Sequence, residues 1–549
     1  MRGDTIMKNV KYLFATMMLG LVLSSCGDNF LTQYPEGGVL LNDQYDKLPD
    51  NLKGSIMGIY SKLYEYGGDH DVFGQRSIDM YGDIQSGDMA MKSSSYGWFE
   101  SYERGYFYAY ARNYIWSYYY DIINLTNLGA LAVEEHKKEI MSAALDEEEE
   151  PSETIKMQGY YYGQMLALRG WAYAGLLNYY CDPMDQLKNI KEKQPAVPVY
   201  TETEIKIPNL MGAKRSSVAA VYDRIYEDLT ESIYLLDYYS RFFSRGSSKL
   251  EINADIARLI LAYAMLNHGD KDDKVFNGQT ESAYDVALAR AKEVIDGGQF
   301  PILPKSKLTT TGFADIQSEN WMWAQDVTVE TTTGLASFFG QVDIHSYSYA
   351  AAGDTKAIDS KLYDEIIAKG WDARADWFNP GNASFAYCPS RKFFNPSTKD
   401  ITDLDKVDRN WLADNVFMRV ELAYLIAAEA AWANGDEATS VQYLKQLCDE
   451  RVADGQEDAY NVWIGTLSGD ALKNAIIYNW RVEMWGEGYG LQTLRRLSKK
   501  VTLGSNHLSR ADQELNIGTQ FIHFQCEIPT SETRYNPWIG TTQLANDTK

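Results

Sequence analysis

The stretch VFMRVELAYLIAAEAAWANG, residues 416–435, is the strongest indication of the fold class. Its apolar residues recur at the three- and four-residue spacing of an α-helix. This stripe comprises Val416, Val420, Ala423, Tyr424, Ala427 and Ala431. Gly435 follows as a typical helix stop. The pattern predicts a helix over Val416–Trp432 that buries one face.

A second amphipathic segment, Val441–Val452, follows after a short polar connection, and Ile256–Asn267 with Ala283–Ile295 form a similar pair. Helix pairs of this size resemble tetratricopeptide-type units, which stack side by side. No strict repeat of about 34 residues is visible, because long insertions separate the pairs. We predict a mainly α fold, with tetratricopeptide-like helical pairs in an α-α superhelix and long irregular loops that form a ligand-binding face.

The same periodicity predicts several further helices. They are expected at Leu52–Tyr66, Tyr108–His136, Met165–Tyr179, Val218–Leu236 and Ala471–Glu487, with Ser216 and Ser217 as N-caps of the fourth. Long irregular stretches lie between them, at Gly67–Arg104, Pro301–Asp359 and Trp371–Asn415. Loops of such length are usually functional or disordered. Their aromatic content argues against disorder.

The N-terminus has the pattern of an export signal. Lys8 and Lys11 precede an apolar run over residues 12–23, which is too short for a typical membrane-spanning helix. The run ends in Leu23-Ser24-Ser25-Cys26, which looks like a bacterial lipobox. We therefore expect residues 1–25 to be removed and Cys26 to carry acyl chains. A plain signal peptide with a chance cysteine is the alternative.

Composition excludes some classes of protein. The formal charge of the 549 residues is −24, and it becomes −26 without residues 1–25, because three basic residues and one acidic residue are lost. This acid excess argues against nucleic-acid binding and against electrostatic docking on anionic lipid. Besides Cys26, four cysteines are widely spaced, so we expect isolated buried thiols.

No catalytic pattern is present. The sequence lacks H-E-x-x-H, G-x-S-x-G and Walker A motifs, so we predict no catalytic residues and no cofactor. A structural calcium is the one metal considered, because Asp69-His70-Asp71 and Asp270–Asp273 supply oxygen ligands. Solvated acidic turns are the alternative for both.

Seven motifs, in the expected order, resemble the SusD/RagB family of nutrient-binding lipoproteins from Bacteroidetes. Two are the opening Cys26–Pro35 (CGDNFLTQYP) and Arg481–Arg496 (RVEMWGEGYGLQTLRR). The others lie at Trp116–Asn127, Ala167–Tyr179, Arg215–Leu229, Arg419–Ala430 and Glu527–Pro537. Gly490 and Thr493 stand where the family usually has Arg and Asp. Four charged residues within these motifs are expected to pair with each other or with helix ends. They are Glu429, Arg481, Glu483 and Glu487.

The resemblance implies a single domain over residues 26–549, with an N-terminal part of about 26–240 and a C-terminal part of about 241–549. It implies a lipid-anchored protein on the outer membrane, exposed at the cell surface. It also implies a glycan ligand, which is handed to a partner, a SusC-like TonB-dependent transporter. The scaffold could instead bind peptides or another nutrient, and a glycosidase is a remote alternative.

Sugar rings stack their C–H faces on aromatic planes, while their hydroxyls bond to polar side chains. We therefore predict ligand-binding residues in two loop clusters. The first comprises Tyr96, Trp98, Phe99 and Tyr102, with Arg76 and Asp83 as hydroxyl partners, and the second comprises Phe338, Tyr347 and Tyr349. Core packing is the alternative for each aromatic residue, since most of the 40 Tyr, 19 Phe and 13 Trp must be buried.

Overall fold

The computed structural model describes most of the chain after residue 47. The described ranges are 48–105, 109–146, 150–182, 193–208, 210–243, 249–271, 274–276, 279–311, 313–378, 382–394, 411–516 and 525–540. The predicted signal and Cys26 lie outside the described residues. All these ranges belong to one unit, Val39–Lys549.

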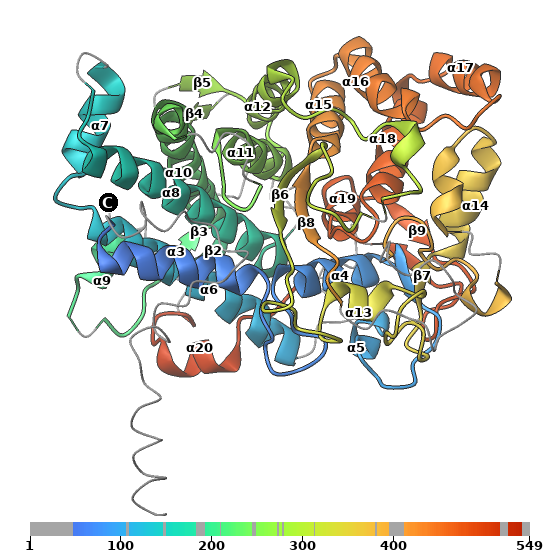
Figure 1. Ribbon diagram of the computed structural model, residues 1–549, viewed down its shortest axis with the longest axis horizontal. Helices are drawn as coiled ribbons and strands as arrows, with labels where there is room; N and C mark the ends of the chain where they lie inside the picture. Colours follow the sequence, from blue (N-terminus) through green and yellow to red (C-terminus); the bar gives the residue numbers. More distant parts are fainter. Residues whose placement is uncertain are drawn as a thin grey trace, which may run out of the picture. The chain divides into compact units, whose positions relative to one another are not determined.

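Helices dominate the described ranges (Figure 1). The longer ones are α3 (Asp50–Leu63), α4 (Gln75–Ser86), α6 (Ala109–Ala132), α7 (Lys137–Asp146), α8 (Glu153–Tyr180), α10 (Val218–Tyr239), α11 (Ala254–His268), α12 (Ala283–Gly297), α14 (Ser360–Lys369), α15 (Glu421–Ala433), α16 (Glu437–Asp449), α17 (Glu457–Gly465) and α18 (Gly469–Glu483). The shorter ones are α5 (Glu100–Glu103), α9 (Glu202–Ile205), α13 (Phe338–Val342), α19 (Gly490–Arg496) and α20 (Thr530–Tyr535), with 3₁₀ turns at Ser240–Phe242, Lys305–Lys307, Ala373–Phe378 and Ala383–Phe385.

Successive long helices pack on one another in chain order. α3 contacts α6, α6 contacts α8, α8 contacts α10, and the row continues through α11, α12, α15 and α16. The two predicted pairs appear in it as α11 with α12 and α15 with α16. Local capping fixes where these helices begin, since Ser217 caps α10 and Ser282 forms a capping box on α12. The predicted mainly α fold of tetratricopeptide-like pairs is confirmed.

The helix predicted over Val416–Trp432 is wrong at its start. Residues Asn415–Arg419 form strand β8, which pairs antiparallel with β6 (Trp321–Gln325), and α15 begins only at Glu421. A short run of β-branched and aromatic residues suits a strand as well as a helix, so periodicity alone could not separate the two. The predicted Ala471–Glu487 helix likewise ends early, at Glu483.

The strands of the described residues form two-stranded antiparallel ladders. Besides β6 with β8, they are β1 (Met89–Met91) with β7 (Lys356–Ile358), β2 (Pro195–Pro198) with β3 (Arg215–Ser217), β4 (Lys274–Phe276) with β5 (Gln279–Glu281), and β9 (Lys500–Thr502) with β10 (Glu514–Asn516). The β1–β7 ladder joins distant parts of the chain, with Ala90 opposite Ala357. It therefore controls where the loops next to these strands lie.

A buried cluster of charges ties the C-terminal helices to the long insertion between α12 and α15. The carboxylate of Glu483 accepts hydrogen bonds from Arg374, Arg419 and Arg451 at 2.8–3.0 Å, and all four side chains are fully buried. Burial alone would raise the Glu483 pKa, but the three guanidinium groups outweigh it and hold this pKa well below its usual range. The charge cluster is thus a satisfied interior network.

The other charged residues of the motifs are also paired, and the described cysteines are also buried. Glu487 pairs with Arg419, Glu429 pairs with Arg496, and Arg481 pairs with Asp88. The four motif residues are thus paired, but with other charged side chains and not with each other. The four described cysteines are free and buried, as predicted, and they are Cys181, Cys388, Cys448 and Cys526.

Candidate functional site

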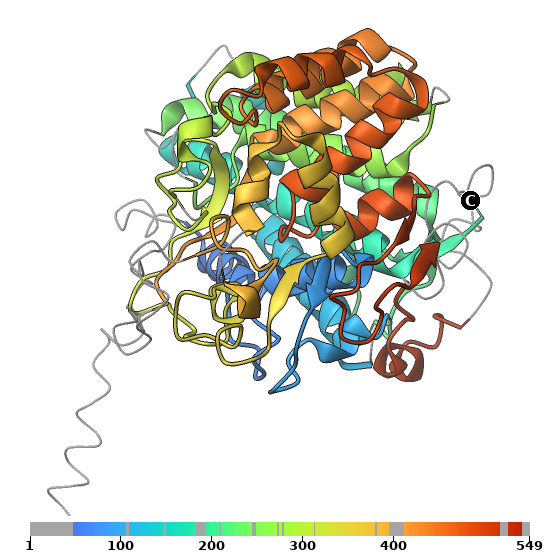
Figure 2. The same cartoon turned by 90° about the vertical axis from the view of Figure 1, so that its right-hand side faces the viewer.

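Three loops from distant parts of the sequence meet at one end of the β1–β7 ladder. In an antiparallel pair, the chain leaves one strand where it enters the other. Residues 92–99, which follow β1, therefore lie beside residues 343–355, which precede β7, and Lys92 N donates to Thr355 O at 2.8 Å. The blue chain after β1 and the yellow chain before β7 adjoin in the lower part of Figure 2. Residues 64–74, before α4, complete the group.

Side chains from these loops form an aromatic cluster of Tyr66, His70, Tyr96, Trp98 and Tyr349. The His70 ring stacks on Trp98, with centroids 5.2 Å apart and planes 21° from parallel. Tyr349 meets Tyr96 edge-on at 5.2 Å, and its hydroxyl lies 2.9 Å from His70 Nδ1. Tyr66 and Tyr96 are the most exposed members, at 54% and 61%. The rings of Tyr66 and Tyr96 are therefore exposed to solvent, while His70, Trp98 and Tyr349 beside them are held together by ring contacts and a hydrogen bond.

The backbone of the cluster is held by one buried carboxylate. Asp354 accepts hydrogen bonds from the backbone N–H groups of Ser95 at 2.6 Å, Tyr96 at 2.7 Å and Trp98 at 3.1 Å. Gly97 between them has φ +88°, a conformation that favours glycine. The backbone of residues 95–98 therefore forms a tight turn around the carboxylate. The three hydrogen bonds fix the backbone positions from which the side chains of Tyr96 and Trp98 project.

A second buried layer supports His70. Gln341 Nε2 donates to the His70 carbonyl at 2.8 Å, and Lys356 Nζ donates to Gln341 Oε1 at 2.7 Å. Burial lowers the Lys356 pKa to about 7, although the nearby charges of Asp354 and Asp71 oppose this shift. Lys356 is the first residue of β7, and Asp354 lies two residues before it. The β1–β7 ladder therefore positions these two supporting side chains as well as the loops.

Tyr347 lies on the same loop as Tyr349 but in a neighbouring group. Its side chain is 47% exposed, and its ring centroid lies 6.5 Å from that of Trp411. The Trp411 indole N–H donates to the Tyr347 carbonyl at 2.9 Å. These two rings add a second exposed aromatic surface carried by the 343–355 loop.

The remaining predicted contact residues lie in the interior. Phe99, Tyr102, Phe338, Arg76 and Asp83 are each at most 2% exposed. The Arg76 guanidinium lies 4.0 Å from the centroid of the Phe338 ring and donates to the Gly486 carbonyl at 2.7 Å. In this structure these side chains are packed in the interior, and almost none of their surface reaches solvent.

Asp83 explains one departure from the family motif. Its carboxylate accepts from the backbone N–H groups of Gly488 and Gly490 at 3.1 and 3.2 Å, and burial raises its pKa to about 7. A Cβ at Gly490 would lie 2.5 Å from Asp88 Oδ2. Any side chain at position 490 would therefore require the Asp88 carboxylate to move.

Within the described ranges, no group of three or more His, Cys, Asp or Glu side chains is arranged to hold a metal ion. The Asp69-His70-Asp71 turn uses His70 in the aromatic cluster, and Asp270–Asp273 lies partly outside the described residues. Among the same residues, none of the helices is both long and apolar enough to span a membrane.

Sequence reasoning missed His70, Tyr66 and Asp354 as members of the site. His70 and Tyr66 precede α4 in the same loop. Tyr66 has no motif around it, and His70 was noted only as part of the acidic turn Asp69-His70-Asp71. Asp354 is 258 residues from Tyr96, whose N–H it binds. The sequence signals for this part of the site were the two long stretches Gly67–Arg104 and Pro301–Asp359, which contain His70 and Asp354.

Comparisons with known proteins agree with this architecture. A profile of the family described as "Starch-binding associating with outer membrane" matches residues 50–261, and a profile of the family described as "SusD family" matches residues 344–545. A search of curated proteins gave no match.

Solved structures share the fold over nearly the whole chain. A SusD-like carbohydrate binding protein from Bacteroides vulgatus is 20% identical, with a TM-score of 0.66 and coverage of 91% of this chain and 99% of its own. A SusD superfamily protein from Bacteroides thetaiotaomicron is 20% identical, with a TM-score of 0.65 and coverage of 92% and 100%. One from Bacteroides fragilis is 20% identical, with a TM-score of 0.66 and coverage of 90% and 99%.

The fold and the site define a helical-repeat scaffold with a loop-built aromatic surface. The two family profiles together match well over half of the sequence, in the order expected along one chain. The chain belongs to the SusD/RagB family.

Proposed function

We propose that this protein is a cell-surface lipoprotein that captures an oligo- or polysaccharide and delivers it to a SusC-like TonB-dependent transporter. The observation that supports it most is the aromatic cluster, in which Trp98, Tyr96 and Tyr349 come from two loops and share one bonded base. Rigid aromatic side chains lose little conformational entropy when a ligand binds. Their faces suit the C–H faces of sugar rings, and the Tyr hydroxyls suit sugar hydroxyls.

We propose three parts of this surface as contacts. Trp98 and Tyr349, whose rings meet edge-on, provide the base. Tyr96 provides the most exposed ring, and Tyr347 extends the surface toward Trp411. The buried residues of the sequence prediction, among them Phe99 and Arg76, are not among the proposed contacts, because their side chains barely reach solvent. We propose no catalytic residue and no cofactor.

The proposal includes the membrane anchor and the domain plan. Residues 1–25 act as a lipoprotein signal, Cys26 is acylated, and residues 26–549 form one domain. Mass spectrometry of the mature N-terminus tests this part, since an unmodified Cys26 would contradict it.

Binding of the full chain to a panel of oligosaccharides tests the ligand class. We expect Trp98→Ala and Tyr347→Ala each to weaken oligosaccharide binding by roughly 30-fold, the equivalent of about 2 kcal/mol for a buried aromatic contact. Melting temperatures should stay close to that of the unaltered protein. Tyr535→Ala, at a 74% exposed tyrosine on α20, is the matched control and should change nothing.

Other outcomes discriminate among the alternatives. Full oligosaccharide affinity in both variants would show that the ligand binds elsewhere. Binding to a peptide panel, with no binding to oligosaccharides, would favour peptide capture on the same scaffold. Cleavage of a polysaccharide by the purified protein would establish a glycosidase. Co-purification with a TonB-dependent barrel tests the transporter partner.

A further inference from the structure

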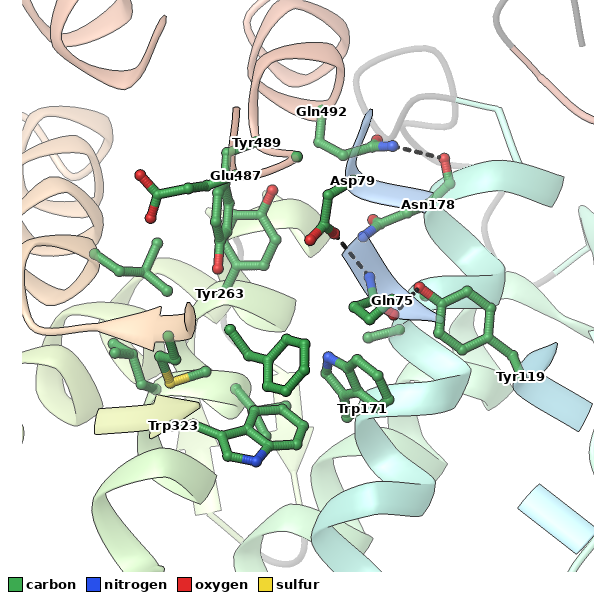
Figure 3. Close-up of a pocket in the computed structure, with 18 of the residues that line it drawn as sticks. Gln75, Asp79, Tyr119, Trp171, Asn178, Tyr263, Trp323, Glu487, Tyr489 and Gln492 are labelled. Atoms are coloured by element: carbon green, nitrogen blue, oxygen red, sulfur yellow. Dashed lines mark hydrogen bonds between the residues drawn. The ribbon is translucent and has the colours of Figure 1, made fainter. Parts of the chain in front are cut away.

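A second space suited to a ligand lies inside the protein, away from the aromatic cluster. This cavity of about 100 Å³ is lined by residues of α4, α6, α8, α11, α15, the β6–β8 ladder and the segment 487–492 (Figure 3). It shares no lining residue with the aromatic cluster. Its occupant would therefore be bound independently of the surface site.

One wall of the cavity is a continuous row of aromatic rings. Tyr119 meets Trp171 edge-on at 5.7 Å, Trp171 meets Trp323 edge-on at 5.4 Å, and Phe417 lies 5.3 Å from Trp323. These rings come from α6, α8, β6 and β8, so that the ladder and the helical row both contribute to the wall. Such a wall is suited to the C–H face of a small ring.

The opposite end of the cavity is polar. Asp79 accepts from Gln75 Nε2 at 2.8 Å and from Arg76 at 3.0 Å, and each of its oxygens keeps a further lone pair. Asn178 lines the same end. In Figure 3, the Trp171 indole nitrogen is on the side of its ring that faces Gln75, and the hydrogen bonds drawn there reach neither this N–H nor the Asn178 amide nitrogen.

The charge of this end favours a neutral occupant. Burial raises the Asp79 pKa to about 6. When the Asp79 carboxyl group is ionised, the Arg76 guanidinium balances its negative charge. The Glu487 carboxylate, which also lines the cavity, is paired with Arg419 and Lys392. A cation would find no uncompensated carboxylate, whereas hydroxyl groups could both donate to Asp79 and accept from the indole N–H.

Size limits the occupant to one small ring. A water molecule needs about 10–15 Å³ of such space, so the cavity holds about six to ten waters. That number of waters corresponds to one monosaccharide ring. Together, the aromatic wall, the neutral polar end and the volume describe a pocket for a ring with many hydroxyls.

We propose that this cavity binds a single neutral monosaccharide, with its C–H face against Trp171 and Trp323 and its hydroxyls at Asp79 and Asn178. The proposal does not depend on oligosaccharide capture at the aromatic cluster. A protein with no surface ligand at all could still take a monosaccharide here.

Calorimetric titration of the full chain with D-glucose, D-galactose, D-mannose, D-xylose and N-acetyl-D-glucosamine tests the proposal. We expect at least one of them to bind with one site per chain. Ala174→Leu, which fills the cavity from α8, should weaken this binding at least tenfold. Trp98→Ala, in the aromatic cluster, should leave it unchanged.

Asp79→Asn serves as a second variant, because it keeps the volume of the side chain even if Ala174→Leu does not fold. It should also weaken binding at least tenfold. Absence of binding by all five sugars to the unaltered protein would overturn the proposal. Binding that survives both cavity variants and is lost in Trp98→Ala would also overturn it, since the sugar would then lie on the aromatic cluster.

Discussion

Replacement of Asp354 by Asn should loosen the loop that carries Tyr96 and Trp98. The unaltered carboxylate accepts three backbone N–H groups, at 2.6, 2.7 and 3.1 Å. An asparagine keeps one oxygen for two of these donors and turns an NH₂ group toward the Trp98 N–H, where two donors then face each other. The side-chain volume is almost unchanged, so the effect reports on hydrogen bonding rather than on packing.

The expected magnitude follows from these bonds. A hydrogen bond to a charged group contributes about 1.5–3 kcal/mol, and one between neutral groups contributes about 1 kcal/mol. Loss of one charged bond and weakening of two others therefore costs about 3 kcal/mol of local stability. At about 1.4 kcal/mol per factor of ten, the loop should open roughly 100-fold more often.

Hydrogen exchange of the peptide that spans residues 93–99, followed by mass spectrometry, measures this opening directly and needs no ligand. Asp364→Asn, at an exposed position on α14, is the matched control and should leave exchange unchanged. Exchange in Asp354→Asn that equals that of the control would refute the assignment of Asp354 as the anchor of this loop. If the proposed function is right, oligosaccharide affinity should fall with the loss of protection.

Two further predictions concern the interior. Glu483→Ala should lower the free energy of unfolding by about 3–5 kcal/mol in urea titrations, because three buried guanidinium groups lose their shared acceptor. Glu330→Ala, at an exposed position, is the control, and an equal loss of stability in the two variants would contradict this prediction. Burial lowers the His507 pKa, but bonds to Asp359 and Glu103 outweigh it, so the net pKa is raised. The stabilisation from protonated His507 is then fully present below pH about 6.5 and lost as the pH rises through the raised pKa. The stability difference between the unaltered protein and His507→Gln should shrink over that window, and a constant difference would argue against a protonated imidazole.

Much of the helical scaffold could be predicted from spacing alone. Long amphipathic segments such as Val218–Tyr239 have many apolar positions, and a serine cap marks where this one begins. The prediction failed at Val416, which lies in a strand that only one residue, Val420, separates from the start of a helix. There the choice depends on pairing with β6, nearly a hundred residues earlier, which no local pattern contains.

The candidate site was less accessible to prediction. Trp98 and Phe99 are adjacent in the sequence and have similar neighbours, yet Trp98 is half-buried in the surface cluster and Phe99 is 1% exposed. The difference comes from the turn at Gly97 and the left-handed φ of +66° at Phe99, which point the two rings in different directions. Of the partners of Trp98, Tyr349 is brought near by the β1–β7 ladder, and His70 comes from the loop before α4.

That ladder also sets when the aromatic surface can exist. Its two strands are separated by more than 260 residues, so their pairing is a contact of high sequence separation, which typically forms late in folding. A nascent chain that has been synthesised or translocated only as far as α12 already contains Tyr96 and Trp98, but not Tyr349, Asp354 or β7. Such a chain has the rings without their anchor. The rings and their anchor can therefore come together only after the polypeptide has emerged as far as β7.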